Sequence, residues 1–174
     1  MSQERVEISG QPAQGLTPAE WRAAMGCFPS GVTVVTAWDG QAALGATVSS
    51  FCSVALEPPL LLVCLDRSNV VREPVVRSGV FGVNFLAEGD HHLARQFGSK
   101  PDTGRFAGHA FYAEEGEAPR LAEAAVFIHC HVETSHPAGD HLIVVGRGLR
   151  VVHAQACAPL LYHQGGFPLL RPTE

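Results

Sequence analysis

The stretch Gly45-Ala46-Thr47-Val48-Ser49-Ser50-Phe51-Cys52-Ser53-Val54-Ala55-Leu56-Glu57-Pro58-Pro59-Leu60 carries the strongest fold signal in this 174-residue chain. It predicts one β-strand that ends at the two prolines, because proline has no N–H to donate to a sheet. Strand alternation places Thr47, Ser49 and Phe51 on one face. Hydroxyl groups beside a glycine suit a polar ring or a polyanion that lies close to the backbone. The alternative interpretation is a half-exposed edge strand with Ser and Thr on its solvent-exposed face.

Further strands are predicted on both sides of this stretch. Residues 32–38 are rich in β-branched side chains, and Asp39-Gly40 suits a two-residue hairpin turn into a long strand over residues 43–56. Similar apolar runs predict strands over residues 60–65, 80–86, 126–134 and 142–152. Short turns join these strands, and no β-α-β alternation occurs. We therefore expect a mainly β fold, a closed antiparallel barrel with a few short flanking helices.

Two of the flanking helices have recognisable starts. Thr17 is expected to cap the first helix, with Pro18 at its first position and Glu20 completing a capping box. Asp90 is expected to cap a helix over residues 91–97. The polar residues 1–15 predict a flexible N-terminal tail, which leaves residues 16–174 as one domain.

Charge and cysteine content restrict the class of protein. Acidic residues outnumber basic ones by 17 to 12, which argues against nucleic acid or an anionic membrane as the main partner. A polar N-terminus and the lack of a long apolar segment predict neither a signal peptide nor a membrane span. The five cysteines contain no C-x-x-C pair and are expected to be reduced core residues of a cytoplasmic protein: Cys27, Cys52, Cys64, Cys130 and Cys157.

Several familiar motifs are absent or incomplete. Gly146-Arg147-Gly148 lies inside a strand pattern and lacks the third glycine of a dinucleotide-binding loop. His129 and His131 share one strand face, but the spacing supplies no third or fourth ligand, so no metal site is predicted. His141 follows Gly139-Asp140 at the start of an apolar strand. Its imidazole can meet an incoming ligand there, or it can be a partly exposed strand-end histidine.

Taken together, seven segments in order resemble the flavin reductase-like family, whose members have an FMN-binding split-barrel fold. The resemblance covers roughly residues 21–170, and no single segment is specific alone. The segments are Phe28-Pro29-Ser30-Gly31-Val32-Thr33-Val34-Val35-Thr36, residues 45–54, Pro58-Pro59-Leu60, residues 79–86, Arg95-Gln96-Phe97, Gly139-Asp140-His141-Leu142-Ile143 and Tyr162-His163-Gln164-Gly165-Gly166-Phe167.

The resemblance implies an NAD(P)H:flavin oxidoreductase. Such an enzyme transfers a hydride from NADH or NADPH to FMN or FAD, and many relatives supply the reduced flavin, by diffusion, to a separate monooxygenase. It also implies a homodimer with the flavin near the subunit interface. A flavin-binding electron carrier of the same fold, without its own NAD(P)H oxidation, is the alternative. A structural barrel without a cofactor is a third reading, which flavin binding would exclude.

The same resemblance assigns roles to individual positions. His141 corresponds to the histidine often found beside the nicotinamide and is the one predicted catalytic residue. The closing segment Gly165-Gly166-Phe167 lacks the arginine that relatives usually have there, and Asn69 stands where many have a further Ser or Thr. The predicted cofactor-binding residues are Ser30, Gly31, Val32, Thr47, Val48, Ser49, Ser50, Asp66, Arg67, Ser68, Asn84, Phe97, Lys100, Arg105 and Phe167.

Overall fold

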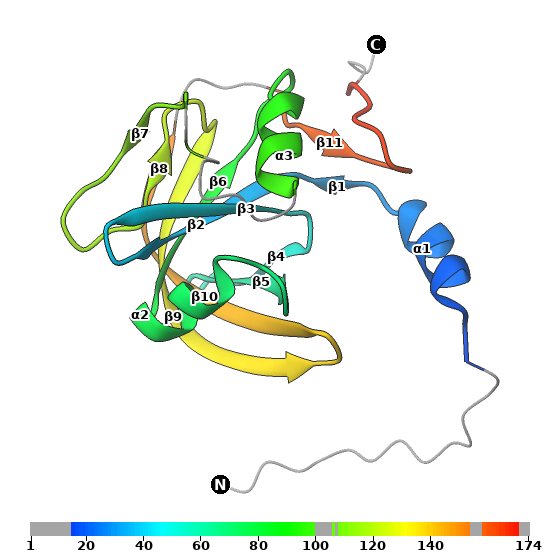
Figure 1. Cartoon of the computed structure of the whole chain (residues 1–174), viewed down its shortest axis with the longest axis horizontal. Helices are drawn as coiled ribbons and strands as arrows, with labels where there is room; N and C mark the ends of the chain where they lie inside the picture. Colours follow the sequence, from blue (N-terminus) through cyan, green and yellow to red (C-terminus); the bar gives the residue numbers. More distant parts are fainter. Residues whose placement is uncertain (1–14, 100–105, 107, 154–157, 171–174) are drawn as a thin grey trace, which may run out of the picture.

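A computed structural model describes residues 15–99, 106, 108–153 and 158–170. Figure 1 shows these segments folded around one curled sheet with short helices outside it. The predicted tail falls almost wholly on residues 1–14, outside the described residues, as do Lys100, Arg105 and Cys157. The elements are α1 Pro18–Gly26, β1 Ser30–Gly31, β2 Thr33–Asp39, β3 Ala42–Val48, β4 Phe51–Ala55, β5 Leu60–Asp66, α2 Arg72–Ser78, β6 Val80–Phe85, α3 His91–Gly98, β7 Phe111–Tyr112, β8 Arg120–Leu121, β9 Val126–Ala138, β10 His141–His153 and β11 Leu161–Tyr162.

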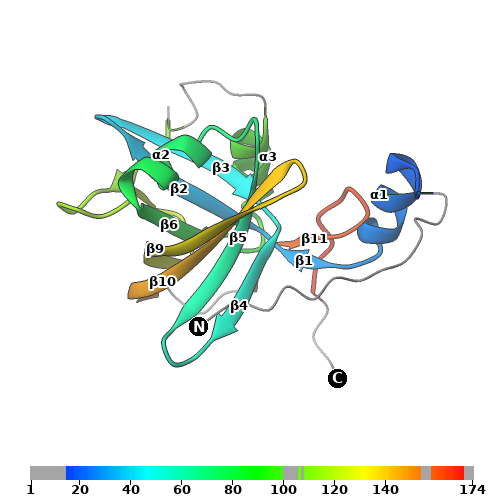
Figure 2. The ribbon, with the colours of Figure 1, turned by 90° about the horizontal axis from the view of Figure 1, so that it is seen from below.

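Seven strands form one antiparallel sheet in the order β3-β2-β6-β9-β10-β5-β4, which confirms the mainly β prediction. Its two edge strands, β3 and β4, are consecutive in the chain and are joined only by Ser49 and Ser50. So short a link requires the sheet to curl until its edges approach each other, as Figure 2 shows. No strand pairing among the described residues joins β3 to β4, so complete closure of the barrel stays a prediction.

The strand expected over residues 43–56 is in fact two strands. β3 stops at Val48, and Ser50 turns away to pair with β5 through the bond from Cys64 N to Ser50 O at 3.1 Å. The hairpin turn between β2 and β3 is also shifted by one residue. Asp39 pairs with Ala42, so the turn is Gly40-Gln41 and Gly40 takes the positive φ of 60°.

Two apolar clusters fill the structure. One lies inside the curl of the sheet and includes Val35, Phe81 and Val144, all fully buried. The other lies between the sheet and α3 and includes Leu93 and Phe97. The second cluster holds α3 against the β3 side of the sheet, which sets the position of the cavity described below.

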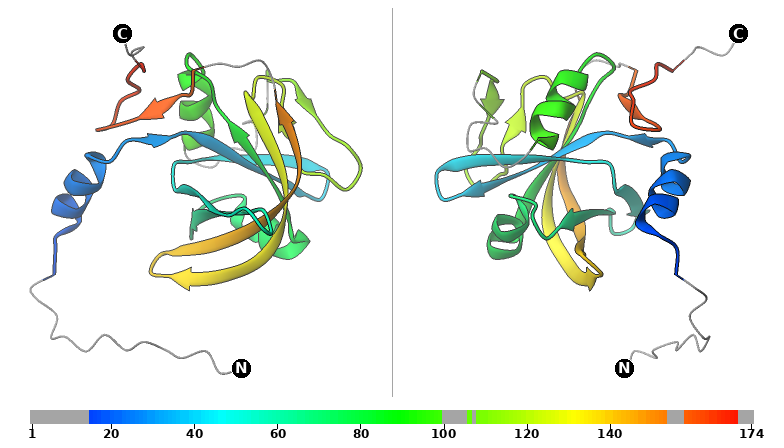
Figure 3. Two further views of the ribbon diagram at one scale, coloured as in Figure 1. Left: turned by 180° about the vertical axis from the view of Figure 1, so that it is seen from behind. Right: turned by 45° about the vertical axis from the view of Figure 1, so that its right-hand side comes forward.

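The first helix has the predicted start but little packing. Thr17 accepts a bond from the backbone of Glu20, and the Glu20 carboxylate accepts one from Thr17 N, which confirms the capping box. α1 buries none of its residues and stands away from the sheet in Figure 3. Asp90 is the N-cap residue of α3, as predicted, but its side chain makes no capping bond to the helix. Its carboxylate accepts a bond from Ala87 N, before the helix.

The cysteines differ from the expectation. The four in the described part of the chain are free thiols, but Cys27 and Cys52 are exposed and Cys64 is half-buried. Only Cys130 is buried, and burial raises its pKa to about 12. No helix among the described residues is long and apolar enough to cross a membrane.

A buried histidine makes stability depend on pH. His129 is 5% exposed, lies opposite Arg150 in the β9–β10 pairing, and has an Nδ1 atom without a hydrogen-bond partner among the described residues. Burial lowers its pKa, although Glu117 nearby opposes this shift. The unfolded chain therefore takes up a proton below about pH 6.5 that the folded protein does not.

We expect the free energy of unfolding to fall as the pH falls from the unfolded pKa of His129 toward its lower folded value. Each unit of pKa difference is worth about 1.4 kcal/mol. Urea unfolding at several pH values measures this slope. His129→Gln should flatten the slope, whereas His136→Gln, at an exposed position further along β9, is the control. An unchanged slope in His129→Gln would contradict the assignment.

Candidate functional site

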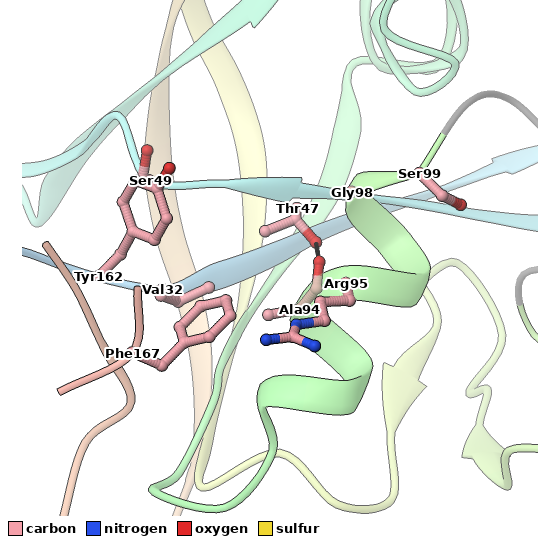
Figure 4. A pocket seen from close by; sticks show the side chains of 9 residues that line it. All are labelled: Val32, Thr47, Ser49, Ala94, Arg95, Gly98, Ser99, Tyr162 and Phe167. Carbon is pink, nitrogen blue, oxygen red and sulfur yellow. Dashed lines mark hydrogen bonds between the residues drawn. The ribbon is translucent and has the colours of Figure 1, made fainter. Parts of the chain in front are cut away.

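A cavity of about 430 Å³ lies between β3, α3 and the C-terminal segment. Figure 4 shows its lining, in which Thr47 of β3 and Ser49 of the β3–β4 link lie around the same space as Arg95 and the rings of Tyr162 and Phe167. Three parts of the chain that are distant in sequence meet there. Its lining residues are Val32, Thr47, Ser49, Ala94, Arg95, Gly98, Ser99, Tyr162 and Phe167.

The hydroxyl groups of the cavity have different roles. Thr47 Oγ1 donates to Ala94 O at 2.7 Å, so this side chain fastens β3 to α3 while it lines the cavity. Ser49 is exposed and faces the opening. Gly45 does not provide room for a ligand, because a Cβ at Gly45 would lie 2.7 Å from the Phe97 ring. The missing side chain of Gly45 lets α3 pack closely on β3.

Arg95 is the only cation that lines the cavity in the described part of the chain. Its guanidinium carbon lies 5.8 Å from the centroid of the Phe167 ring. The centroid of that ring lies 5.7 Å from the centroid of the Tyr162 ring. Within the described part of the chain, Arg95 forms no ion pair with a carboxylate. A guanidinium over an aromatic ring and free of carboxylates is suited to an anionic ligand that also carries rings.

Sequence reasoning missed Arg95 and Tyr162 as site residues. The closing segment lacks an arginine of its own, and the fold supplies one from α3 beside Phe167. The signal was present, because Arg95-Gln96-Phe97 and the segment from Tyr162 to Phe167 are both among the family-like stretches. Only the folded chain shows that these two stretches meet.

A second hollow of about 370 Å³ adjoins the cavity. Ser30, Gly31, Val32 and Ser49 are among its lining residues, and the last two also line the cavity. β1 and β11 pair here, with Ser30 opposite Tyr162. The predicted cofactor-binding residues 30–32 therefore lie beside Ser49, and their contact with a flavin stays a prediction.

Four of the predicted residues, Asp66, Arg67, Ser68 and His141, lie at the turn between β9 and β10. Asp66 Oδ1 accepts bonds from Ser68 N and Oγ, which lower the pKa of Asp66. Arg67 holds the turn, since its backbone N–H donates to Asp140 O and its guanidinium to Gly139 O. One carboxylate oxygen each of Asp66 and Asp140 and one ring nitrogen of His141 lie within 4.8 Å of one another.

A short path joins this turn cluster to the cavity. Ser50 follows Ser49 directly, and its Oγ donates to Cys64 O at 3.1 Å. Asp66 lies two residues further along β5, which is about 7 Å at the rise of a β-strand. Neither hollow is lined by His141, so one ligand would have to extend past Ser50 to reach both groups.

Three predicted binding residues have buried side chains that line neither hollow. Asn84 is fully buried and bonds to Val34 O and Thr36 Oγ1, while its own oxygen accepts from Leu121 N. Phe97 is 1% exposed and Val48 is 4% exposed, and both belong to the apolar clusters. Strand and helix alternation turns these side chains inward, away from the cavity.

Comparisons with known proteins agree with this geometry. A model of the flavin reductase like domain matches residues 25–171. The chain is 32% identical to the flavin-dependent monooxygenase reductase subunit HsaB of Rhodococcus jostii, over 97% of this chain and 87% of that protein. It is 35% identical to an NADH:FMN oxidoreductase of Rhodococcus qingshengii, over 96% of this chain and 89% of that protein.

A solved structure shows the same fold. The NADH:FAD oxidoreductase SgcE6 of Streptomyces globisporus, in complex with NAD and FAD fragments, superposes with a TM-score of 0.83. It is 31% identical, and the match covers 92% of this chain and 98% of that one. The family model spans most of the chain, and the relatives match nearly its full length. This protein therefore belongs to the flavin reductase like family.

Proposed function

We propose that this protein is an NAD(P)H-dependent flavin reductase that transfers a hydride from NADH or NADPH to FMN or FAD. The observation that carries the proposal is the cavity in which Arg95 lies over Phe167, with no carboxylate partner in the described part of the chain, together with Thr47 of β3 and Ser49 of the β3–β4 link. Among the described residues, neither this cavity nor the adjoining hollow is lined by an acid or a histidine. That lining suits a reaction in which the protein positions two rings and does not itself supply a proton.

The lining fits a flavin. Ser49 offers a hydroxyl group to polar ring edges, Thr47 can accept a bond there through its hydroxyl oxygen, and Arg95 offers a bidentate donor to a phosphate. Bound flavin would supply the hydride acceptor. Val32 and Phe167 would exclude water from one side of the rings, and His141 would meet the nicotinamide at the other end of the site.

A steady-state assay that crosses FMN and FAD with NADH and NADPH tests the proposal. We expect NAD(P)H oxidation that depends on added flavin and saturable quenching of flavin fluorescence. Flavin binding without NAD(P)H oxidation would favour the electron-carrier alternative. A failure to bind either flavin would overturn the proposal.

His141→Ala should raise the KM for NAD(P)H by about five- to tenfold, the value of one lost hydrogen bond. The side chain is 42% exposed, so its removal should leave the fold intact. Flavin affinity, measured by fluorescence quenching, should change little, because His141 lines neither hollow. His136→Ala, at an exposed position on β9, is the control. Unchanged kinetics for both nucleotides would remove His141 from the site.

We also propose that two copies pair through the outer face of β4, β5 and β10. A hollow of about 470 Å³ lies on this face, and apolar side chains around it are open to solvent. Leu56 is 86% exposed, and Leu149 and Val151 are about half exposed. Exposed apolar patches of this kind mark interaction surfaces, and a second copy of the same chain is the commonest partner.

Leu149→Glu should shift the protein from dimer to monomer in light scattering, because it places a charge in the apolar hollow. Val76→Glu, at an α2 residue that is 55% exposed and outside the hollow, should leave the dimer intact. A monomeric wild-type protein across a wide concentration range would contradict the pairing.

We propose that the curled sheet is the closed split barrel of the family, with its seam at Ser49 and Ser50. We propose that reduced flavin diffuses to a partner monooxygenase in the cytoplasm. The exposed rim residues Ser49, Arg95 and Ser99 and the relatives named as monooxygenase reductase components support diffusion. Product formation with reductase and oxygenase separated by a dialysis membrane tests it.

A further inference from the structure

The turn between β9 and β10 contains a carboxylate-imidazole contact. His141 Nδ1 lies 2.7 Å from Asp140 Oδ1. This bond lowers the pKa of Asp140, so the carboxylate is ionised at neutral pH and can only accept. Nδ1 must therefore carry the proton of the contact. No hydrogen bond to Nε2 is formed within the described residues, and the side chain is 42% exposed, so Nε2 is open to an incoming ligand.

The backbone on both sides of this contact is held in place. His141 opens β10 and pairs with Asp66 on β5 and with Ala138 on β9. Arg67 holds the two preceding carbonyl groups. Its backbone N–H donates to Asp140 O at 3.0 Å, and its guanidinium donates to Gly139 O at 2.9 Å. With the turn anchored in this way, the bond to Asp140 restricts the ring of His141.

Asp66 is the other carboxylate that faces this ring. It is close enough to interact with His141 through its charge. Its Oδ1 is already bonded to Ser68 N and Ser68 Oγ, whereas Asp140 bonds to the ring itself. Both carboxylates place a negative charge near the ring, but only Asp140 forms a hydrogen bond to it. Asp66 is therefore a matched control for Asp140.

We propose that Asp140 is a positioning residue that holds His141 in the Nδ1–H tautomer, with an unprotonated Nε2 turned toward the nucleotide. An Nε2 acceptor pairs with an N–H donor, such as the amide nitrogen of a nicotinamide carboxamide. The opposite tautomer would place an N–H donor at Nε2, facing the donor of the carboxamide, and would lose the bond from Nδ1 to Asp140. This role rests on the proposed function of His141, but the tautomer itself does not.

Nitrogen NMR of the full-length protein reports the tautomer directly. At a pH about two units above the ordinary imidazole pKa, we expect the wild-type His141 to show a protonated Nδ1 and an unprotonated Nε2. Asp140→Ala should shift the ring toward the Nε2–H form. Asp66→Asn removes a charge of the same sign and should leave the tautomer unchanged, and His141→Ala assigns the signals. A wild-type Nε2–H form, or an Asp140→Ala spectrum like that of the wild type, would overturn the proposal.

Kinetics test whether the tautomer matters. Asp140→Ala should raise the KM for NAD(P)H by about five- to tenfold, as loss of one hydrogen bond predicts, with flavin affinity unchanged. Asp140→Glu should recover part of the loss. In a His141→Ala background, Asp140→Ala should have no further effect, since contacts that act through one residue are not additive.

The two proposals fail in different ways. A further loss in the His141→Ala background would show that Asp140 does not act through His141. Wild-type kinetics in the single His141→Ala variant would overturn the role of His141, while the NMR result would still decide the tautomer.

Discussion

Ser49→Trp should lower flavin affinity by at least about a hundredfold, or about 2.7 kcal/mol. Ser49 lines both the cavity beside α3 and the adjoining hollow, so an indole at this position would occupy the space shared by the two. The residue is exposed and lies in the two-residue link between β3 and β4, so the larger side chain need not disturb the core. Fluorescence quenching with FMN and FAD measures the affinity, and circular dichroism checks the fold.

Ser49→Ala is the matched control for the loss of the hydroxyl group alone. It should cost about 1 kcal/mol, the usual value of one hydrogen bond, or about a fivefold loss in affinity. Wild-type affinity in Ser49→Trp would place the flavin outside both hollows.

Asn84→Ala should lower the free energy of unfolding by about 3 kcal/mol or more, because a buried donor and two acceptors lose their partner together. Leu121 N donates to Asn84 Oδ1 at 2.9 Å, and Asn84 Nδ2 donates to Val34 O at 3.0 Å. These bonds join β2 and β6 to the segment at β8. Urea unfolding measures the effect.

The same variant separates a structural role from the binding role predicted for Asn84. Flavin affinity of the folded protein should be unchanged, since Asn84 lines neither hollow. Thr36→Val, which removes one partner of the same network, should cost less. A stable Asn84→Ala protein with weakened flavin binding would restore Asn84 to the site.

Local rules predicted the local structure well. The capping box of Thr17 and Glu20 is contained in four consecutive residues, and it is confirmed. The apolar runs that predicted strands became β2, β5, β6, β9 and β10, because side-chain alternation and the turn residues between runs are properties of neighbouring residues. The seven segments that together resembled the family predicted it correctly, because the family model matches the chain.

The errors arose where a distant contact overrides the local pattern. Nothing within residues 43–56 indicates a break at Ser49. The break follows from the pairing of Ser50 with Cys64 across the curled sheet. Asn84 and Phe97 belong to family-like segments, yet strand pairing and helix packing turn them into the core.

The sequence by itself determined that the chain forms antiparallel strands with a hydroxyl-rich segment, and which family it resembles. Tertiary structure alone decided which of those side chains line a common cavity. Arg95, Phe167 and Ser49 meet because α3, the C-terminal segment and β3 pack together around one apolar cluster. Such a meeting depends on the register and packing of segments far apart in the chain, which no local periodicity encodes.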